Sequence, residues 1–126
     1  MRFIPTQIHG VMDYFMGLLL MAAPWLLGFA EGGAETWIPV ILGAGTIVYS
    51  LMTDYELGAV HLIPMPVHLG LDAVSGALLA VSPWLFGFDE RVWIPHLVLG
   101  LAEIAAALTT QTHPRYAEGR RHTAST

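Results

Sequence analysis

The chain has 126 residues, of which 55% are hydrophobic and only 12% are charged. A soluble domain usually carries about twice that share of charged residues, so a water-facing surface of the usual kind is excluded. The net charge of −5 gives no reason to expect nucleic-acid binding, and the absence of cysteine excludes disulfides, thiolate metal ligands and thiol catalysis. Most of the surface is therefore predicted to face a lipid bilayer.

Four apolar segments follow one another along the chain. They cover residues 8–29, 37–52, 67–88 and 93–108. A bilayer core of about 30 Å needs about 20 helical residues, a length that the first and third segments reach and the other two approach with their flanking residues. The sequence predicts an all-α protein, a bundle of four transmembrane helices forming a single membrane domain over residues 1–112. A polar cytoplasmic tail is expected over residues 113–126.

The arginines predict the orientation of the bundle. Arg2, Arg115, Arg120 and Arg121 lie on the side of the two termini, whereas only Arg91 lies on the other side. The positive-inside rule then places both termini in the cytoplasm. Four tryptophans are expected near the opposite interface, where their partly polar rings are stable; they are Trp25, Trp37, Trp84 and Trp93.

The first and third segments are copies of one another. When the sequence is shifted by 59 positions, ten of the 21 residues from 9 to 29 are identical. The matches include His9 with His68, Asp13 with Asp72, Gly17 with Gly76, and Pro24-Trp25 with Pro83-Trp84. A shift of 56 then matches Trp37-Ile38-Pro39 with Trp93-Ile94-Pro95. We predict two tandem helical-hairpin repeats, about 6–54 and 65–111, related by a pseudo-two-fold axis along the membrane normal.

The repeats also carry a short motif, Ser82-Pro83-Trp84 in the second copy and Ala23-Pro24-Trp25 in the first. With this motif and its duplication, the chain resembles the SPW-repeat family of small integral membrane proteins, whose repeat is a two-helix unit. The resemblance covers about residues 9–111 and implies architecture and a bacterial inner membrane, but no activity. The prolines should kink or end their helices, and the Ser82 hydroxyl should bond a carbonyl one turn back.

Each repeat places a histidine and an aspartate four residues apart. His9 and Asp13, like His68 and Asp72, then share one helix face. The leading interpretation is a structural pair, with the carboxylate stabilised by the helix N-terminus and hydrogen-bonded to its histidine. Because the two-fold axis would gather all four residues at one depth, a proton relay and a divalent metal site are the alternatives. Haem between His9 and His68 is a further alternative.

Glu103 is expected near the bilayer midplane, facing the bundle interior on one helix face with His96 and Gly100. The first repeat has Thr46 or Ile47 at the matching place. An interhelical hydrogen bond is the leading interpretation, and an ion-handling role is the alternative. The expected partners of Glu103 are Thr46, Tyr49 or Ser75.

Signatures of known enzyme classes are lacking, so we predict no catalytic residues and favour a role other than catalysis. The leading prediction is a structural or accessory membrane protein without a cofactor, which contacts lipid and packs against further copies of itself or another membrane protein. One alternative is a proton or ion translocator that uses Asp13, Asp72 and Glu103. The other is a metal- or haem-binding redox subunit that uses His9 and His68.

Overall fold

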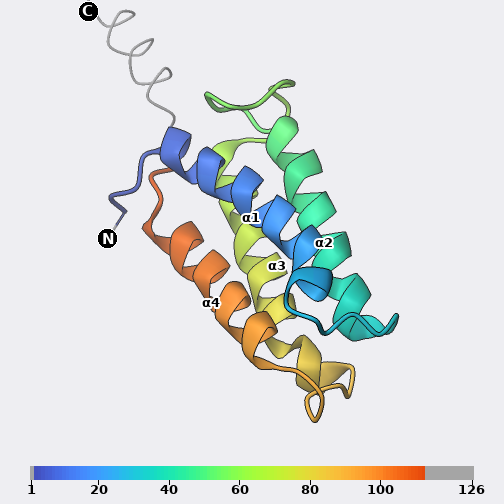
Figure 1. Cartoon of the computed structure of the whole chain (residues 1–126). Helices are drawn as coiled ribbons and strands as arrows, with labels where there is room; N and C mark the ends of the chain where they lie inside the picture. Colours follow the sequence, from blue (N-terminus) through green and yellow to red (C-terminus); the bar gives the residue numbers. More distant parts are fainter. Residues whose placement is uncertain (1, 113–126) are drawn as a thin grey trace, which may run out of the picture.

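A computed structural model describes residues 2–112, so the predicted tail at 113–126 lies outside the described residues. The described part contains four helices and no strand, which confirms the all-α prediction (Figure 1). The helices are α1 (Thr6–Leu26), α2 (Ala34–Leu51), α3 (Met65–Leu85) and α4 (Ile94–Thr109). By length and composition, α2 and α3 are able to cross a membrane, whereas α4 is apolar but has only 16 residues.

Two ends of the bundle can be distinguished in Figure 1. The start of α1, the end of α4 and the α2–α3 linker lie together at what we call the terminal end, at the top of the view. Backbone bridges from Ile4 to Thr110 and from Thr53 to Ile63 tie these segments there. The α1–α2 and α3–α4 loops lie at the opposite end, the loop end. Both hairpins therefore run in the same direction.

The helices α1 and α3 end three residues earlier than the apolar segments suggested, at Leu26 and Leu85. Each end follows a proline inside the helix, and Gly28 and Gly87 then take a φ of 75° in the left-handed region, which favours glycine. The apolar residues beyond these points belong to the loops. Sequence hydropathy alone does not separate them from the helices.

The Pro83 ring leaves the Leu79 carbonyl, one turn back in α3, without its usual amide partner. The Ser82 hydroxyl donates to that carbonyl at 2.7 Å, and Ser82 is fully buried. This confirms the bond expected for the serine of the motif. The first repeat has Ala23 at this place, so it lacks an equivalent hydroxyl.

Within each hairpin the two helices touch at a pair of glycines. A Cβ atom built on Gly43 would lie 2.6 Å from the Gly17 carbonyl oxygen, and one on Gly100 would lie 2.5 Å from the Gly76 carbonyl oxygen. Such small residues allow helix backbones to pack in direct contact. Between the hairpins, α2 packs against α3.

The buried faces of α2 and α4 correspond at a shift of 57 residues. Pro39, Gly43, Thr46 and Ser50 in α2 match His96, Gly100, Glu103 and Ala107 in α4. The Trp-Ile-Pro match at a shift of 56 is therefore one residue out of register with the packing. Because burial decides which residues are equivalent, Thr46 rather than Ile47 takes the place of Glu103 in the first hairpin.

Adding a methyl group at Gly100 is expected to lower the unfolding free energy by about 1–3 kcal/mol, because it must displace the backbone of α3. Gly70 and Gly45 are the matched controls, since a Cβ atom on either meets nothing within 4 Å. Gly70→Ala and Gly45→Ala should be neutral or stabilising through helix propensity. Denaturant titration in detergent checks this, and equal losses in all three variants would contradict the contact.

Candidate functional site

The two histidine–aspartate pairs meet inside the bundle near the terminal end. His9, Asp13, His68 and Asp72 are all at least 94% buried, and one ligand atom from each lies within 4.8 Å of the others. The structure brings together the four residues that hold matching positions in the two repeats. We call them the His–Asp cluster.

The shortest bonds of the cluster cross from one helix to the other. His9 Nε2 lies 2.6 Å from Asp72 Oδ2, and His68 Nε2 lies 2.6 Å from Asp13 Oδ2. The distances within each helix are longer, 3.1 Å for His9 to Asp13 and 3.3 Å for His68 to Asp72. Each histidine is thus bound mainly by the aspartate of the other repeat. The cluster therefore links α1 to α3. The leading interpretation had each histidine bonded to the aspartate of its own helix, and did not predict this link.

Two threonines hold the outer nitrogens of the imidazole rings. His9 Nδ1 lies 2.7 Å from Thr110 Oγ1, and His68 Nδ1 lies 2.7 Å from Thr53 Oγ1. Each hydroxyl donates its single hydrogen to a backbone carbonyl one turn back, at 2.6 Å. The hydroxyl oxygen must then accept from the ring, so Nδ1 carries a hydrogen in both histidines. Nε2 is the nitrogen that faces the aspartates.

Tyr49 makes the cluster asymmetric. Its hydroxyl donates to Asp72 Oδ1, the oxygen that is not shared with His9. At the packing shift of 57 residues, the matching position in α4 is Ala106, which has no hydroxyl. Asp72 is therefore held from two sides, by His9 and by Tyr49, while Asp13 has no equivalent tyrosine.

The linker between the hairpins lies over the cluster. Tyr55 is fully buried with Met65 and Leu69, and its ring centroid is 5.6 Å from that of His68. The linker is fixed to α1 by a bond from the Thr6 hydroxyl to Glu56 at 2.7 Å. Sequence reasoning missed Tyr55 and both threonines. The threonines carry a signal, since Thr53 and Thr110 are 57 residues apart and each lies just after the second helix of its repeat.

Glu103 lies deeper in the bundle. It is 6% exposed, and a Cβ atom on Gly76 would lie 3.0 Å from its Cβ, so it faces α3 one helical turn from Asp72. Neither carboxylate oxygen has a hydrogen-bond partner among the described residues. The predicted bond to Thr46, Tyr49 or Ser75 is therefore wrong. Thr46 donates to the carbonyl of Leu42 and Tyr49 donates to Asp72, so those hydroxyl hydrogens are already used.

His96 shares a buried face with Gly100 and Glu103, as predicted. Its Nε2 atom, however, forms its hydrogen bond near the loop end and not with Glu103. Pro39 in α2 frees the Glu35 carbonyl, and His96 Nε2 donates to it at 3.0 Å. The Arg91 guanidinium adds bonds to Glu31 at 2.6 Å and to Glu35 at 3.3 Å. These bonds of His96 and Arg91 to Glu31 and Glu35 join the second hairpin to the first at the loop end.

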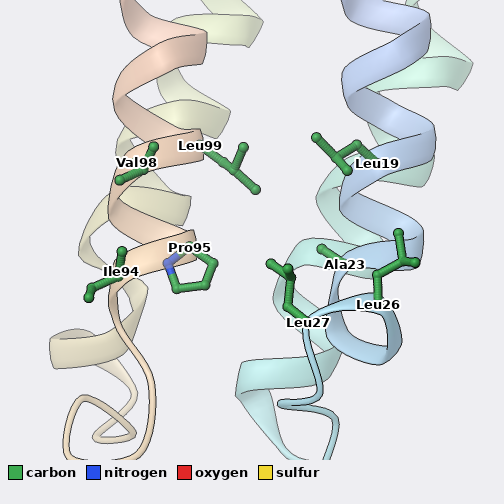
Figure 2. A pocket seen from close by; sticks show the side chains of 8 residues that line it. All are labelled: Leu19, Ala23, Leu26, Leu27, Ile94, Pro95, Val98 and Leu99. Carbon is green, nitrogen blue, oxygen red and sulfur yellow. The ribbon is translucent and has the colours of Figure 1, made fainter.

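A groove of about 400 Å³ opens between α1 and α4 near the loop end (Figure 2). Its walls are entirely apolar, and they consist of Leu19, Ala23 and Leu26 from α1, Leu27 directly after it, and Ile94, Pro95, Val98 and Leu99 from α4. With no polar side chain, the groove offers no means of catalysis or ion binding. Among the described residues, the buried carboxylates that have no arginine partner are those of the His–Asp cluster and Glu103.

Haem does not fit between the two cluster histidines. Their ring centroids are 5.6 Å apart in a T-shaped arrangement, and both Nε2 atoms converge on the same two carboxylates. A porphyrin bound between them would need the imidazoles on opposite faces of the macrocycle.

Comparison with known proteins gives one match. A family model described as the SPW repeat domain matches residues 7–110. No curated protein and no solved structure matches the chain. The matched region spans all four helices and contains every residue of the His–Asp cluster.

Proposed function

Because the chain belongs to the SPW repeat family, we propose that it is a small integral membrane protein whose four helices all span the bilayer. In this proposal, the two tandem hairpins form one membrane domain with their pseudo-two-fold axis along the membrane normal. The protein acts as a structural or accessory subunit that packs against further copies of itself or another membrane protein.

The distribution of charge along the helices is the observation that carries this proposal. Each helix contains a single acidic residue and neither lysine nor arginine. These four acids, Asp13, Glu35, Asp72 and Glu103, are all at least 94% buried. Ionisable side chains in membrane helices face the bundle interior in the same way. The helix surfaces that remain outside carry no charged side chain.

Large apolar side chains fill those outer surfaces on every helix. Examples that are more than half exposed are Phe15 and Leu18 on α1, Ile41 and Val48 on α2, Val74 and Leu85 on α3, and Val98 and Leu108 on α4. Apolar exposure over all sides of a small protein is an aggregation hazard in water. In a bilayer the same surface is stable, because the hydrocarbon chains of the lipid are as apolar as the leucine side chains that they contact.

The helix lengths support spanning as well. At 1.5 Å per residue, the 21 residues of α1 and of α3 extend about 32 Å. The 16 residues of α4 extend about 24 Å, which local thinning of the bilayer accommodates. The cytoplasmic placement of both termini rests on the arginine distribution of the sequence, and the bacterial inner membrane on the family resemblance.

Single cysteines test the topology without background labelling, because the natural chain has none. Glu90→Cys lies in the exposed α3–α4 loop and Ala59→Cys in the exposed linker at the terminal end. In right-side-out membrane vesicles, an impermeant maleimide should label Glu90→Cys at once and Ala59→Cys only after permeabilisation. Labelling of both from one side would refute the four-span arrangement, and the cysteine-free chain is the control.

A second candidate function, proton or ion translocation, is supported by Glu103. It is a buried carboxyl without a hydrogen-bond partner among the described residues, one turn from the His–Asp cluster. Ionisable groups inside a membrane commonly belong to proton or ion paths. Flux through proteoliposomes separates the two candidates, because only a translocator dissipates a pH gradient.

A further inference from the structure

We infer that the His–Asp cluster is a binding site for one divalent transition-metal ion of the zinc class. The ligands are Nε2 of His9 and of His68 and one carboxylate oxygen each from Asp13 and Asp72. This inference concerns the chemistry of the cluster and does not depend on which partner the protein has.

The four ligand atoms form a closed ring in which neighbouring atoms are spaced nearly as in a zinc site. Around the ring, successive nitrogen–oxygen distances are 2.6, 3.1, 2.6 and 3.3 Å. Zinc binds imidazole nitrogen and carboxylate oxygen at about 2.0–2.1 Å in tetrahedral sites, which places neighbouring ligand atoms about 3.3 Å apart. Entry of the ion therefore requires the two shortest edges to widen by about 0.7 Å. The most distant ligand atoms, which lie within 4.8 Å of one another, must close toward the same spacing of about 3.3 Å.

The surroundings of the ligands present the correct atoms to an ion. Thr110 and Thr53 fix a hydrogen on Nδ1 of each histidine. Nε2 therefore offers its lone pair to an ion when the proton of its bond to the aspartate is released. Tyr49 binds the outer oxygen of Asp72 and leaves the inner oxygen facing the histidines. Metal-binding histidines and carboxylates are commonly oriented by such outer hydrogen bonds.

The charge of the cluster also suits a divalent cation. The carboxylates of Asp13 and Asp72 belong to a group of ligand atoms that lie within 4.8 Å of one another. Both side chains are almost fully buried. Two neutral imidazoles and two carboxylates carry a charge of −2, which a divalent ion neutralises, whereas unpaired buried charge is strongly unfavourable. All four tetrahedral positions are filled by protein ligands. The site is therefore of the closed, structural type rather than the catalytic type, which keeps one position open.

Cobalt(II) is the probe for the experiment, because tetrahedral coordination gives it a strong visible absorption. The full chain, purified in detergent and stripped with chelator, should bind about one cobalt or zinc ion per chain. His9→Ala and His68→Ala should lose the absorption, and His61→Ala, in the exposed linker, should keep it. Thr110→Val leaves every ligand in place and should weaken binding by about 10–100-fold.

Folding of each variant is checked by circular dichroism, and Asp13→Asn provides a cluster variant of unchanged size that removes one ligand charge. The inference is overturned if the natural chain is folded but shows no cobalt absorption and retains no zinc. Equal binding by the natural chain and all cluster variants would also overturn it, because the ion would then lie elsewhere. Neither result would affect the proposed topology, which the cysteine labelling tests separately.

Discussion

Replacing Asp72 by alanine is expected to lower the unfolding free energy by about 3–5 kcal/mol, because it leaves buried polar groups without their partner. His9 Nε2 loses its acceptor at 2.6 Å, and the Tyr49 hydroxyl loses its acceptor at the same time. Both side chains are inside the bundle, where water does not replace the lost bonds. Denaturant titration of the protein in detergent or nanodiscs measures the loss.

Asp13 is the matched comparison, because it holds the equivalent position in the first repeat. Asp13→Ala removes the acceptor of His68 Nε2 but no tyrosine bond, so its effect should be smaller than that of Asp72→Ala by about 1 kcal/mol. In a Tyr49→Phe background the difference between the two should disappear, since the double-mutant cycle removes the bond that distinguishes them. A loss below about 1 kcal/mol for Asp72→Ala would show that the cluster does not link the hairpins.

The symmetric part of this site could be predicted from the sequence because the repeat and the helical period determine it together. A spacing of four residues places His9 and Asp13 on one face of α1, and the duplication places His68 and Asp72 at the same level of α3. What the pattern does not contain is which aspartate each histidine bonds. Bonds across the two helices and bonds within one helix satisfy the same spacing, and only the packing of α1 against its neighbours decides between them.

The parts that sequence reasoning missed are those that break the repeat or lie outside a helical period. The linker residue Tyr55 covers the cluster from a segment with no periodic pattern. The Trp-Ile-Pro motif suggested a register that differs by one residue from the packing, because tryptophans at a surface are free to shift while glycines in contact are not. His96 was assigned to a polar site, but a proline in another hairpin determines its partner. A motif within α4 does not show that His96 bonds a backbone carbonyl of α2.

Replacing Glu103 by methionine is expected to raise the unfolding free energy, by about 1–3 kcal/mol, although the residue is buried in the middle of the bundle. Its carboxylate loses contact with solvent and gains no hydrogen bond among the described residues, so the desolvation penalty is not offset. Methionine has a similar length and a flexible shape, and it removes the penalty while it fills the space.

Glu35 is the control for that substitution, because it is a second buried glutamate with every expected partner present. Its carboxylate accepts bonds from the Glu31 and Gly33 amides at 3.1 Å and contacts Arg91 at 3.3 Å. Glu35→Met should therefore destabilise the protein, by about 1–3 kcal/mol, because two backbone amides lose their acceptor. Equal losses in both glutamate variants would contradict the account of Glu103 as an unpartnered carboxyl.

Variants of Glu103 also decide between the two candidate functions. A residue that lowers stability is retained where activity requires it, and an intramembrane carboxyl has ion handling as its ordinary use. If Glu103→Met and Glu103→Gln abolish dissipation of a pH gradient in proteoliposomes while the protein stays folded, the translocator is supported. If the methionine variant is more stable and neither the natural chain nor the variants change the gradient, the translocator is refuted. The accessory role then stands.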